Sequence, residues 1–166
     1  MKFRQANEGF DWVFKGKDVA EQITRLKQWA STNQTVVPMV RMGVGAEKVD
    51  WGLPEGTPDT LKLDKDIPEG MGDTTIQMEW RRISGFTDPN HNMQNLPEWK
   101  REMNWLQILE GMQHLEANVL TAIKDGKLLE LYPALEKLLP ELGIPEYNEP
   151  VKKRKPRAKK ANKTTA

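Results

Sequence analysis

The sequence contains no cysteine and only two histidines. The absence of cysteine excludes disulfides, thiolate zinc sites and cysteine nucleophiles. His91 and His114 stand far apart, and neither has a second histidine or a set of carboxylates at a spacing that would hold a metal ion. We therefore expect His91 to be a surface residue in a polar loop and His114 to stand at a helix start, with no metal and no cofactor.

Long apolar runs are also missing. No stretch approaches the roughly 18 apolar residues of a membrane-spanning helix, and the N-terminus lacks the apolar core of a signal peptide. The sequence therefore predicts a soluble cytoplasmic protein with no membrane partner. Carboxylates such as Glu98, Glu102 and Glu110 are plentiful but scattered. They nominate no catalytic residue, so we expect no enzyme and no small-molecule substrate.

Acidic residues are absent from the C-terminal segment 151–166. This segment carries eight basic residues: Lys152, Lys153, Arg154, Lys155, Arg157, Lys159, Lys160 and Lys163. Without them, residues 1–150 hold 17 basic and 24 acidic residues, a net charge of −7, although the whole chain is +1. The sequence thus predicts an acidic domain over 1–150 and a disordered basic tail over 151–166.

The composition of this tail favours sequence-independent binding to nucleic acid, because each neutralised phosphate releases counterions. No aromatic residue is interleaved, so base stacking is not offered. Three other interpretations remain open. The tail can be a self-repelling, solubilising end, it can dock on an acidic protein surface, including that of its own domain, or it can be a nuclear-localisation patch in a eukaryotic host.

Apolar spacing and capping signals predict a mainly α domain of four or five helices. One helix is expected over 18–31, capped by Asp18 with Glu21 at the third position, and a short one over 73–83, with Thr74 and Gln77 as a possible capping box. The clearest unit is 95–126, interpreted as two helices joined at Gly111 and ended at Gly126. A last helix runs from about 132 to 142 and ends at Gly143. Asn95 is expected to cap the first central helix, whose apolar stripe combines Trp99, Met103, Leu106, Ile108 and Leu109, broadened by Trp105.

Two parts of the sequence give no helical signal. Phe10, Trp12 and Phe14 alternate with other residues, which suggests a short strand or an extended arm over 1–16. The segment 33–72 is rich in Gly and Pro and is expected to be a long irregular loop, with Val36–Val40 at best an edge strand because of Pro38. Trp51 in this loop is the candidate partner-binding residue, since tryptophan is enriched at interface hot spots.

The turn over 109–120 resembles a DNA-binding helix-hairpin-helix element in the spacing of Gly111, Met112 and Ala117. Gln113 replaces the glycine that would let the backbone approach a phosphate, and Glu110 and Glu116 would repel one. A packing turn between two helices is therefore the better interpretation.

The same region carries a family resemblance. It consists of two apolar-acidic runs followed by a tyrosine: Leu106, Leu109, Glu110, Gly111 and Met112, then Glu116, Ala117, Val119, Leu120, Ala122, Ile123, Lys124, Asp125, Lys127 and Leu128, then Tyr132. This pattern resembles an uncharacterised protein family of large contractile-tailed (myovirus-type) bacteriophages, with Gln113 and His114 in place of the family's His-Pro turn. The resemblance implies a phage origin and the bacterial host cytoplasm, and it implies no activity or functional residue.

The sequence as a whole predicts a non-enzymatic phage accessory protein that associates with nucleic acid through its tail. The alternative is a virion or assembly component, or a host-directed effector, whose acidic helical body binds a protein partner.

Overall fold

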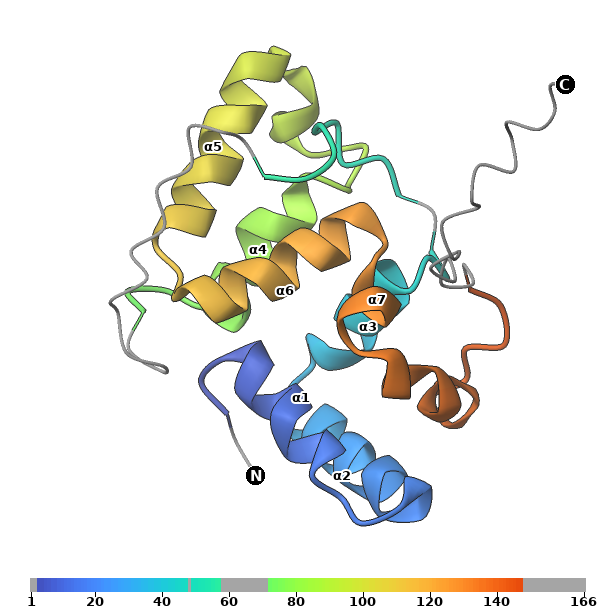
Figure 1. The fold of residues 1–166 in the computed structure, drawn as a ribbon. Helices are drawn as coiled ribbons and strands as arrows, with labels where there is room; N and C mark the ends of the chain where they lie inside the picture. The colour runs from blue at the N-terminus through green and yellow to red at the C-terminus, as the bar shows by residue number, and fades with distance from the viewer. Residues whose placement is uncertain (1–2, 48, 58–71, 148–166) are drawn as a thin grey trace, which may run out of the picture.

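The computed structural model describes residues 3–47, 49–57 and 72–147, and these residues are mainly helical. Helix α6 (His114–Asp125) runs through the middle of the body and contacts α1 (Ala6–Phe14), α3 (Val36–Gly43), α5 (Glu98–Glu110) and α7 (Leu128–Leu131). Figure 1 shows α6 with α5 along one side of the molecule and α1 and α2 (Val19–Thr32) below it. The central position of α6 explains why it is buried on several faces.

Four further elements complete the described part of the chain. They are α2, α4 (Ile76–Gly85) and the 3-10 helices η1 (Asn92–Asn95) and η2 (Pro133–Leu142). The mainly α prediction is confirmed, but the described residues form more helices than the four or five expected. They contain no strand, and their one isolated β-bridge joins Thr74 to Met112 in parallel.

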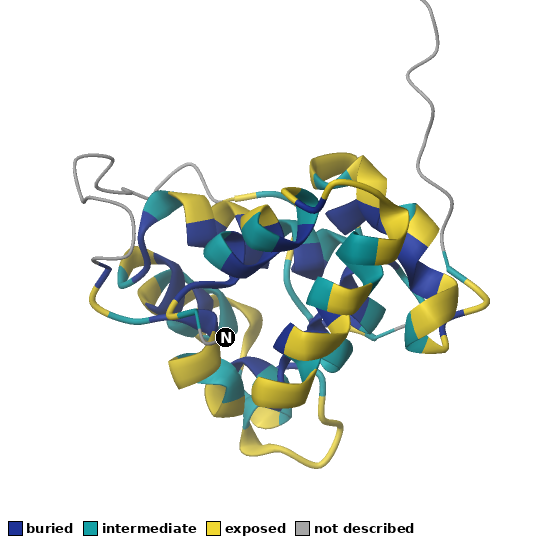
Figure 2. Cartoon of the chain, turned by 90° about the horizontal axis from the view of Figure 1, so that it is seen from below, coloured by how far each residue is buried: buried dark blue, intermediate teal, exposed yellow. Residues whose placement is uncertain are grey.

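The buried side chains form one hydrophobic core to which all seven α-helices contribute. Figure 2 shows the buried residues facing inward and the exposed ones lining the outer surfaces of the helices. The close approach of α1 to α2 requires Gly9, because a Cβ there would lie 2.2 Å from Trp29 Cζ2. Trp29 in turn meets Phe10 edge to face, with 5.0 Å between ring centroids. This contact joins α1 to α2 within the core.

Several predicted helix boundaries are confirmed. Asp18 accepts a hydrogen bond from the Glu21 backbone N–H at 2.8 Å and so caps α2. Gly126 ends α6 in the left-handed conformation, with φ of 69°, and Gly143 ends η2 in the same way, with φ of 74°. Ile144 then donates to the Leu139 carbonyl at 3.1 Å and is itself buried, as expected for a helix that ends on a C′ glycine.

Two predicted caps lie at other residues. Asn95 ends η1, and Pro97 occupies the N-cap position of α5 without a side-chain cap, so the prediction that Asn95 caps this helix is wrong. For α4, the helix itself is confirmed, but its cap is Thr75, whose hydroxyl accepts from the Met78 N–H at 3.1 Å. Both differences are shifts of one or two residues at helix ends.

The first stretch of the chain is a helix, not a strand or an extended arm. Ala6, Phe10 and Val13 follow one another at helical spacing and are buried, whereas Trp12 and Phe14 are only partly buried. The alternation of aromatic residues was therefore misleading, because only Phe10 points fully into the core.

The segment predicted to be irregular over 33–72 contains α3, so that prediction is wrong for Val36–Gly43. Pro38 is the third residue of this helix. A backbone N–H in the first turn has no partner within the helix, so a proline there removes no hydrogen bond. Residues 44–47 and 49–57 are irregular. Residues 48 and 58–71, like the tail over 151–166, lie outside the described residues.

Candidate interaction surfaces

Three helices begin around one buried carboxylate, that of Glu116. Glu116 is the third residue of α6 and is 0% exposed. Its Oε2 accepts a hydrogen bond at 2.7 Å from the backbone N–H of Ala6, the first residue of α1. The backbone N–H of Ile76, the first residue of α4, also lies near this carboxyl group and lowers its pKa. Glu116 therefore caps α1 and lies against the start of α4, at the point where its own helix starts.

Burial raises the pKa of Glu116 from its usual value near 4.5 to about 7. The backbone N–H groups of Ala6 and Ile76 oppose this rise in the pKa, as does the nearby charge of Arg4, whereas the carboxylate of Glu8 adds to it. Desolvation is the largest of these effects because the side chain has no access to water.

Buried amide side chains surround Glu116. Gln5 donates from Nε2 to Asn7 Oδ1 at 2.9 Å and to Gln113 Oε1 at 3.4 Å. The same oxygen of Gln113 accepts from the Leu115 N–H at 2.9 Å, which caps α6. Gln5, Asn7 and Gln113 are all nearly inaccessible to solvent. This polar cluster is shielded from solvent and joins segments that are distant in the sequence.

The opposite end of α6 also buries charge, but in a pair. Lys124 and Asp125 form an ion pair whose side chains are 3% and 8% exposed. Lys124 Nζ also donates to the Pro54 carbonyl at 2.7 Å, and the Gly56 N–H donates to both carboxylate oxygens of Asp125, at 3.1 and 3.2 Å. This pair fastens the segment 49–57 onto the end of α6.

Trp51 is part of this fastened segment and lies in the core. It is 6% exposed and meets Trp105 of α5 edge to face, with 5.5 Å between ring centroids. The interpretation of Trp51 as a surface residue that faces a partner is therefore corrected: the indole fills space between α5 and the end of α6. Glycine and proline around it made the segment look like a free loop, although the ion pair of Lys124 and Asp125 fixes it.

Two open hollows adjoin this segment, with volumes of about 380 and 250 Å³. Both are lined by Val49, Trp51, Lys124 and Asp125. The two charged groups are already bonded to each other and to the backbone of 54–56. The charged groups of Lys124 and Asp125 in these hollows are therefore already bonded within the protein.

The histidines lie as expected. His91 precedes η1 and accepts from the Met93 N–H at 3.0 Å through Nδ1, and His114 is the first residue of α6. No group of three or more histidine or acidic side chains that could hold a metal ion occurs within residues 3–47, 49–57 and 72–147. No helix in the same ranges has the length and apolarity needed to cross a membrane.

The turn at Gly111 packs against the segment before α4. The Thr74 N–H donates to the Gly111 carbonyl at 2.8 Å, and a Cβ on Gly111 would lie 2.9 Å from Thr74 Cγ2. Gly111 has an ordinary φ of −80°, so the space, and not the backbone conformation, requires glycine. The Gly111 carbonyl thus bonds within the protein, as expected for a packing turn between two helices.

Helix α5 has two apolar faces, and only one of them is in the core. Trp105, Ile108 and Leu109 are buried. Trp99 and Met103 are 58% and 51% exposed, with Leu106 half-buried one turn further on. The single predicted stripe is therefore wrong. It combined residues of two faces whose mean directions lie about 130° apart around the helix, at 100° per residue.

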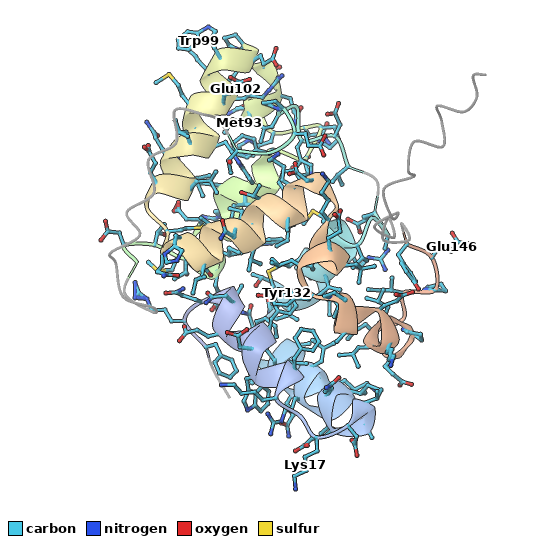
Figure 3. All side chains as sticks on the ribbon, in the orientation of Figure 1. Lys17, Met93, Trp99, Glu102, Tyr132 and Glu146 are labelled. Carbon is cyan, nitrogen blue, oxygen red and sulfur yellow. The ribbon has the colours of Figure 1, made fainter. Side chains whose placement is uncertain are left out.

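The surface residues Trp99, Met103 and Leu106 follow one another at i, i+4 and i+7, and we call them the outer stripe of α5. Figure 3 shows Trp99 at the outer end of α5, pointing away from the body. Lys100 lies over the Trp99 ring, with Nζ 5.4 Å from its centroid. No sequence signal separated this face from the core face, because the two have similar apolar side chains.

Comparisons with protein-family models, with curated proteins and with solved structures found no match. The resemblance to the phage family thus stays a prediction. The eight basic residues of the tail lie outside the described residues, so the nucleic-acid site predicted from the sequence likewise stays a prediction.

Proposed function

We propose that this chain is a non-enzymatic accessory protein that associates with nucleic acid through its basic tail, without sequence preference. The observation that supports this function best is the separation of charge: 151–166 carries eight cations and no anion, while 1–150 has a net charge of −7. An acidic body repels the phosphate backbone, so the attraction is confined to the tail. Several neighbouring phosphates are bridged at once, and counterion release drives the association.

The phage resemblance gives this proposal its setting, which is the cytoplasm of an infected bacterium. There the protein would bind the nucleic acid loosely and remain exchangeable. The helical body would then be carried to the nucleic acid by the tail, because its own net charge does not favour that surface.

A salt titration tests the proposal. If all eight cations engage duplex DNA, the logarithm of the association constant falls with the logarithm of salt concentration with a slope of about −7. Binding is measured by fluorescence anisotropy with labelled duplex DNA, single-stranded DNA and RNA, for the full chain and for a chain ending at residue 150. Binding that survives truncation, or that is absent even at low salt, would refute the proposal.

Two matched variants separate charge from sequence. Replacing the eight basic residues with glutamine should abolish binding, whereas reordering the residues of 151–166 should leave the affinity within about twofold, because phosphate contacts carry no sequence information. A reordered tail that loses most of its affinity would contradict sequence-independent association.

A second function is supported by the outer stripe of α5. We propose as the alternative that the acidic body binds a protein partner, as a virion or assembly component or as a host-directed effector. Apolar side chains as large as Trp99 and Met103 are 58% and 51% exposed there. Contiguous apolar patches on a protein surface commonly mark interaction sites.

A further inference from the structure

We propose that the outer stripe of α5 is a docking surface for an amphipathic helix of another protein. The partner helix would carry basic residues beside its apolar face. This inference rests on the second of the functions proposed above and is independent of nucleic-acid binding by the tail. It adds the location of the surface and the chemistry of the partner.

The spacing of the stripe matches helix-to-helix docking. Trp99, Met103 and Leu106 lie along one side of a straight helix of 13 residues, so they form a continuous ridge. Apolar residues at i, i+4 and i+7 are the pattern by which one helix packs its apolar face against a partner, and α5 presents that pattern on its exposed side. The α5 backbone is held from behind by the buried Trp105, Ile108 and Leu109. The ridge is therefore rigid before a partner arrives, which lowers the entropic cost of binding.

The charges beside the stripe define the partner. Glu98, Glu102 and Glu110 lie on the same helix, and none of them takes part in an ion pair between described residues. Of the two nearby cations, Lys100 lies on the stripe itself, over the Trp99 ring, and the Arg101 guanidinium donates to the carbonyls of Leu96 and Gly52. At 100° per residue, Glu102 and Glu110 lie within about 60° of Trp99 around α5, and Glu98 lies further round the helix. These carboxylates complement lysine or arginine beside an apolar seam.

A second copy of this chain fits the same surface less well. Two outer stripes placed face to face would bring two sets of three carboxylates together, with only Lys100 on each side to offset them. Like charges across an interface cost free energy and suppress that pairing. A partner helix with basic residues beside an apolar face would pack against the ridge and pair with the carboxylates next to it.

Other exposed apolar residues do not form such a surface. Met78 of α4 is 65% exposed, and Leu131 of α7 is 42% exposed, but each is on a different helix from the stripe. Single exposed apolar side chains are common on protein surfaces and need no partner. Met78 thus provides a matched control for the experiment.

The test uses the full chain and a labelled synthetic helical peptide of about 18 residues, with leucines at i, i+3, i+4 and i+7 and lysines beside them. A shuffled peptide of the same composition is the control. At about 150 mM salt, where long-range attraction is screened, the ordered peptide should bind at least about tenfold more tightly than the shuffled one, a difference of about 1.4 kcal/mol. Equal affinity for the two peptides would overturn the proposal, because charge alone would then explain the binding.

Variants locate the surface. The double substitution W99S/M103S should reduce affinity for the ordered peptide by at least about tenfold, and E102K/E110K should weaken it too, whereas M78S should leave it unchanged. Unchanged circular dichroism and thermal unfolding midpoints show that the variants fold. A loss with M78S as large as that with W99S/M103S would overturn the assignment to α5.

Two further measurements separate this inference from its rivals. Truncation after residue 150 should leave peptide binding intact even if it abolishes nucleic-acid binding. Sedimentation equilibrium of the full chain should show a monomer. A dimer that W99S/M103S converts to a monomer would assign the stripe to a second copy and refute the basic partner.

Discussion

The two ends of α6 bury charge in opposite ways. At the C-terminal end, Lys124 and Asp125 neutralise each other and satisfy the backbone of residues 54–56. At the N-terminal end, Glu116 is buried with no ion pair to a basic side chain among the described residues, and its carboxyl group accepts from the Ala6 N–H and lies near the Ile76 N–H. A paired charge can remain ionised in the core, whereas an unpaired carboxyl group is favoured in its neutral form.

This difference predicts opposite responses to neutral substitution. Lys124→Met removes one member of the buried pair and leaves Asp125 uncompensated, so the free energy of unfolding should fall by about 3–5 kcal/mol. Urea denaturation at pH 7 measures the loss. Lys124→Met combined with Asp125→Asn should recover part of it, because the remaining buried charge is also removed. A loss below about 1 kcal/mol for Lys124→Met alone would show that the pair is not what holds residues 49–57.

The second prediction concerns pH. Because the pKa of Glu116 is raised to about 7 in the folded protein and is near 4.5 when unfolded, the unfolded chain ionises first as pH rises. The stability that the neutral side chain provides is complete below pH 4.5 and is lost as the pH rises through 7. At about 1.4 kcal/mol per pKa unit, the loss approaches about 3 kcal/mol by pH 8.

Glu116→Gln is the control for this prediction, since it keeps the shape and removes the titration. Difference curves of unfolding free energy between pH 4.5 and 8, wild type minus variant, should fall with rising pH. A difference curve that does not change with pH would mean that the folded and unfolded states stabilise the ionised form of Glu116 equally. That result would contradict a raised pKa.

The smallest expected change in stability concerns two glycines, Gly111 at the end of α5 and Gly126 at the end of α6. Gly111 is required by space and Gly126 by its left-handed backbone, with φ of 69°. Asparagine tolerates the left-handed region, so Gly126→Asn should cost less than Gly126→Ala, which should lose about 1–2 kcal/mol. At Gly111 both substitutions should cost about 1–3 kcal/mol by overpacking against Thr74. Thermal unfolding distinguishes the cases, and equal costs of alanine and asparagine at Gly126 would contradict the backbone explanation.

The parts of the fold that the sequence predicted are those with local causes. The cap at Asp18, the glycine ends at Gly126 and Gly143, and the turn at Gly111 each depend on a few neighbouring residues. The helices α1 and α3 were missed for local reasons as well. Alternating aromatics imitated a strand in α1, and Pro38 looked like a breaker although it lies in the first turn of α3.

The candidate sites could be predicted less well because they depend on distant contacts. The burial of Glu116 requires α1 and α4, whose first residues, Ala6 and Ile76, are far from it in sequence. The exchange of roles between Trp51 and Trp99 has a similar origin. The ion pair at the end of α6 brings Trp51 into the core, while the side of α5 that carries Trp99 has no covering element among the described residues. Both residues are tryptophans, so amino-acid type alone does not tell which of them is buried and which is exposed.

The hydrogen bond between Ala6 and Glu116 has a consequence for biosynthesis, because its partners are 110 residues apart. The N-terminal pair of helices can pack through Gly9 and Trp29 while the chain is still short. The start of α1, however, has to wait for its carboxylate until the ribosome has added those residues. At 5–20 residues per second, that interval lasts roughly 5–20 s. Although α1 is synthesised before the other described helices, its start is therefore among the last parts of the described fold to be secured.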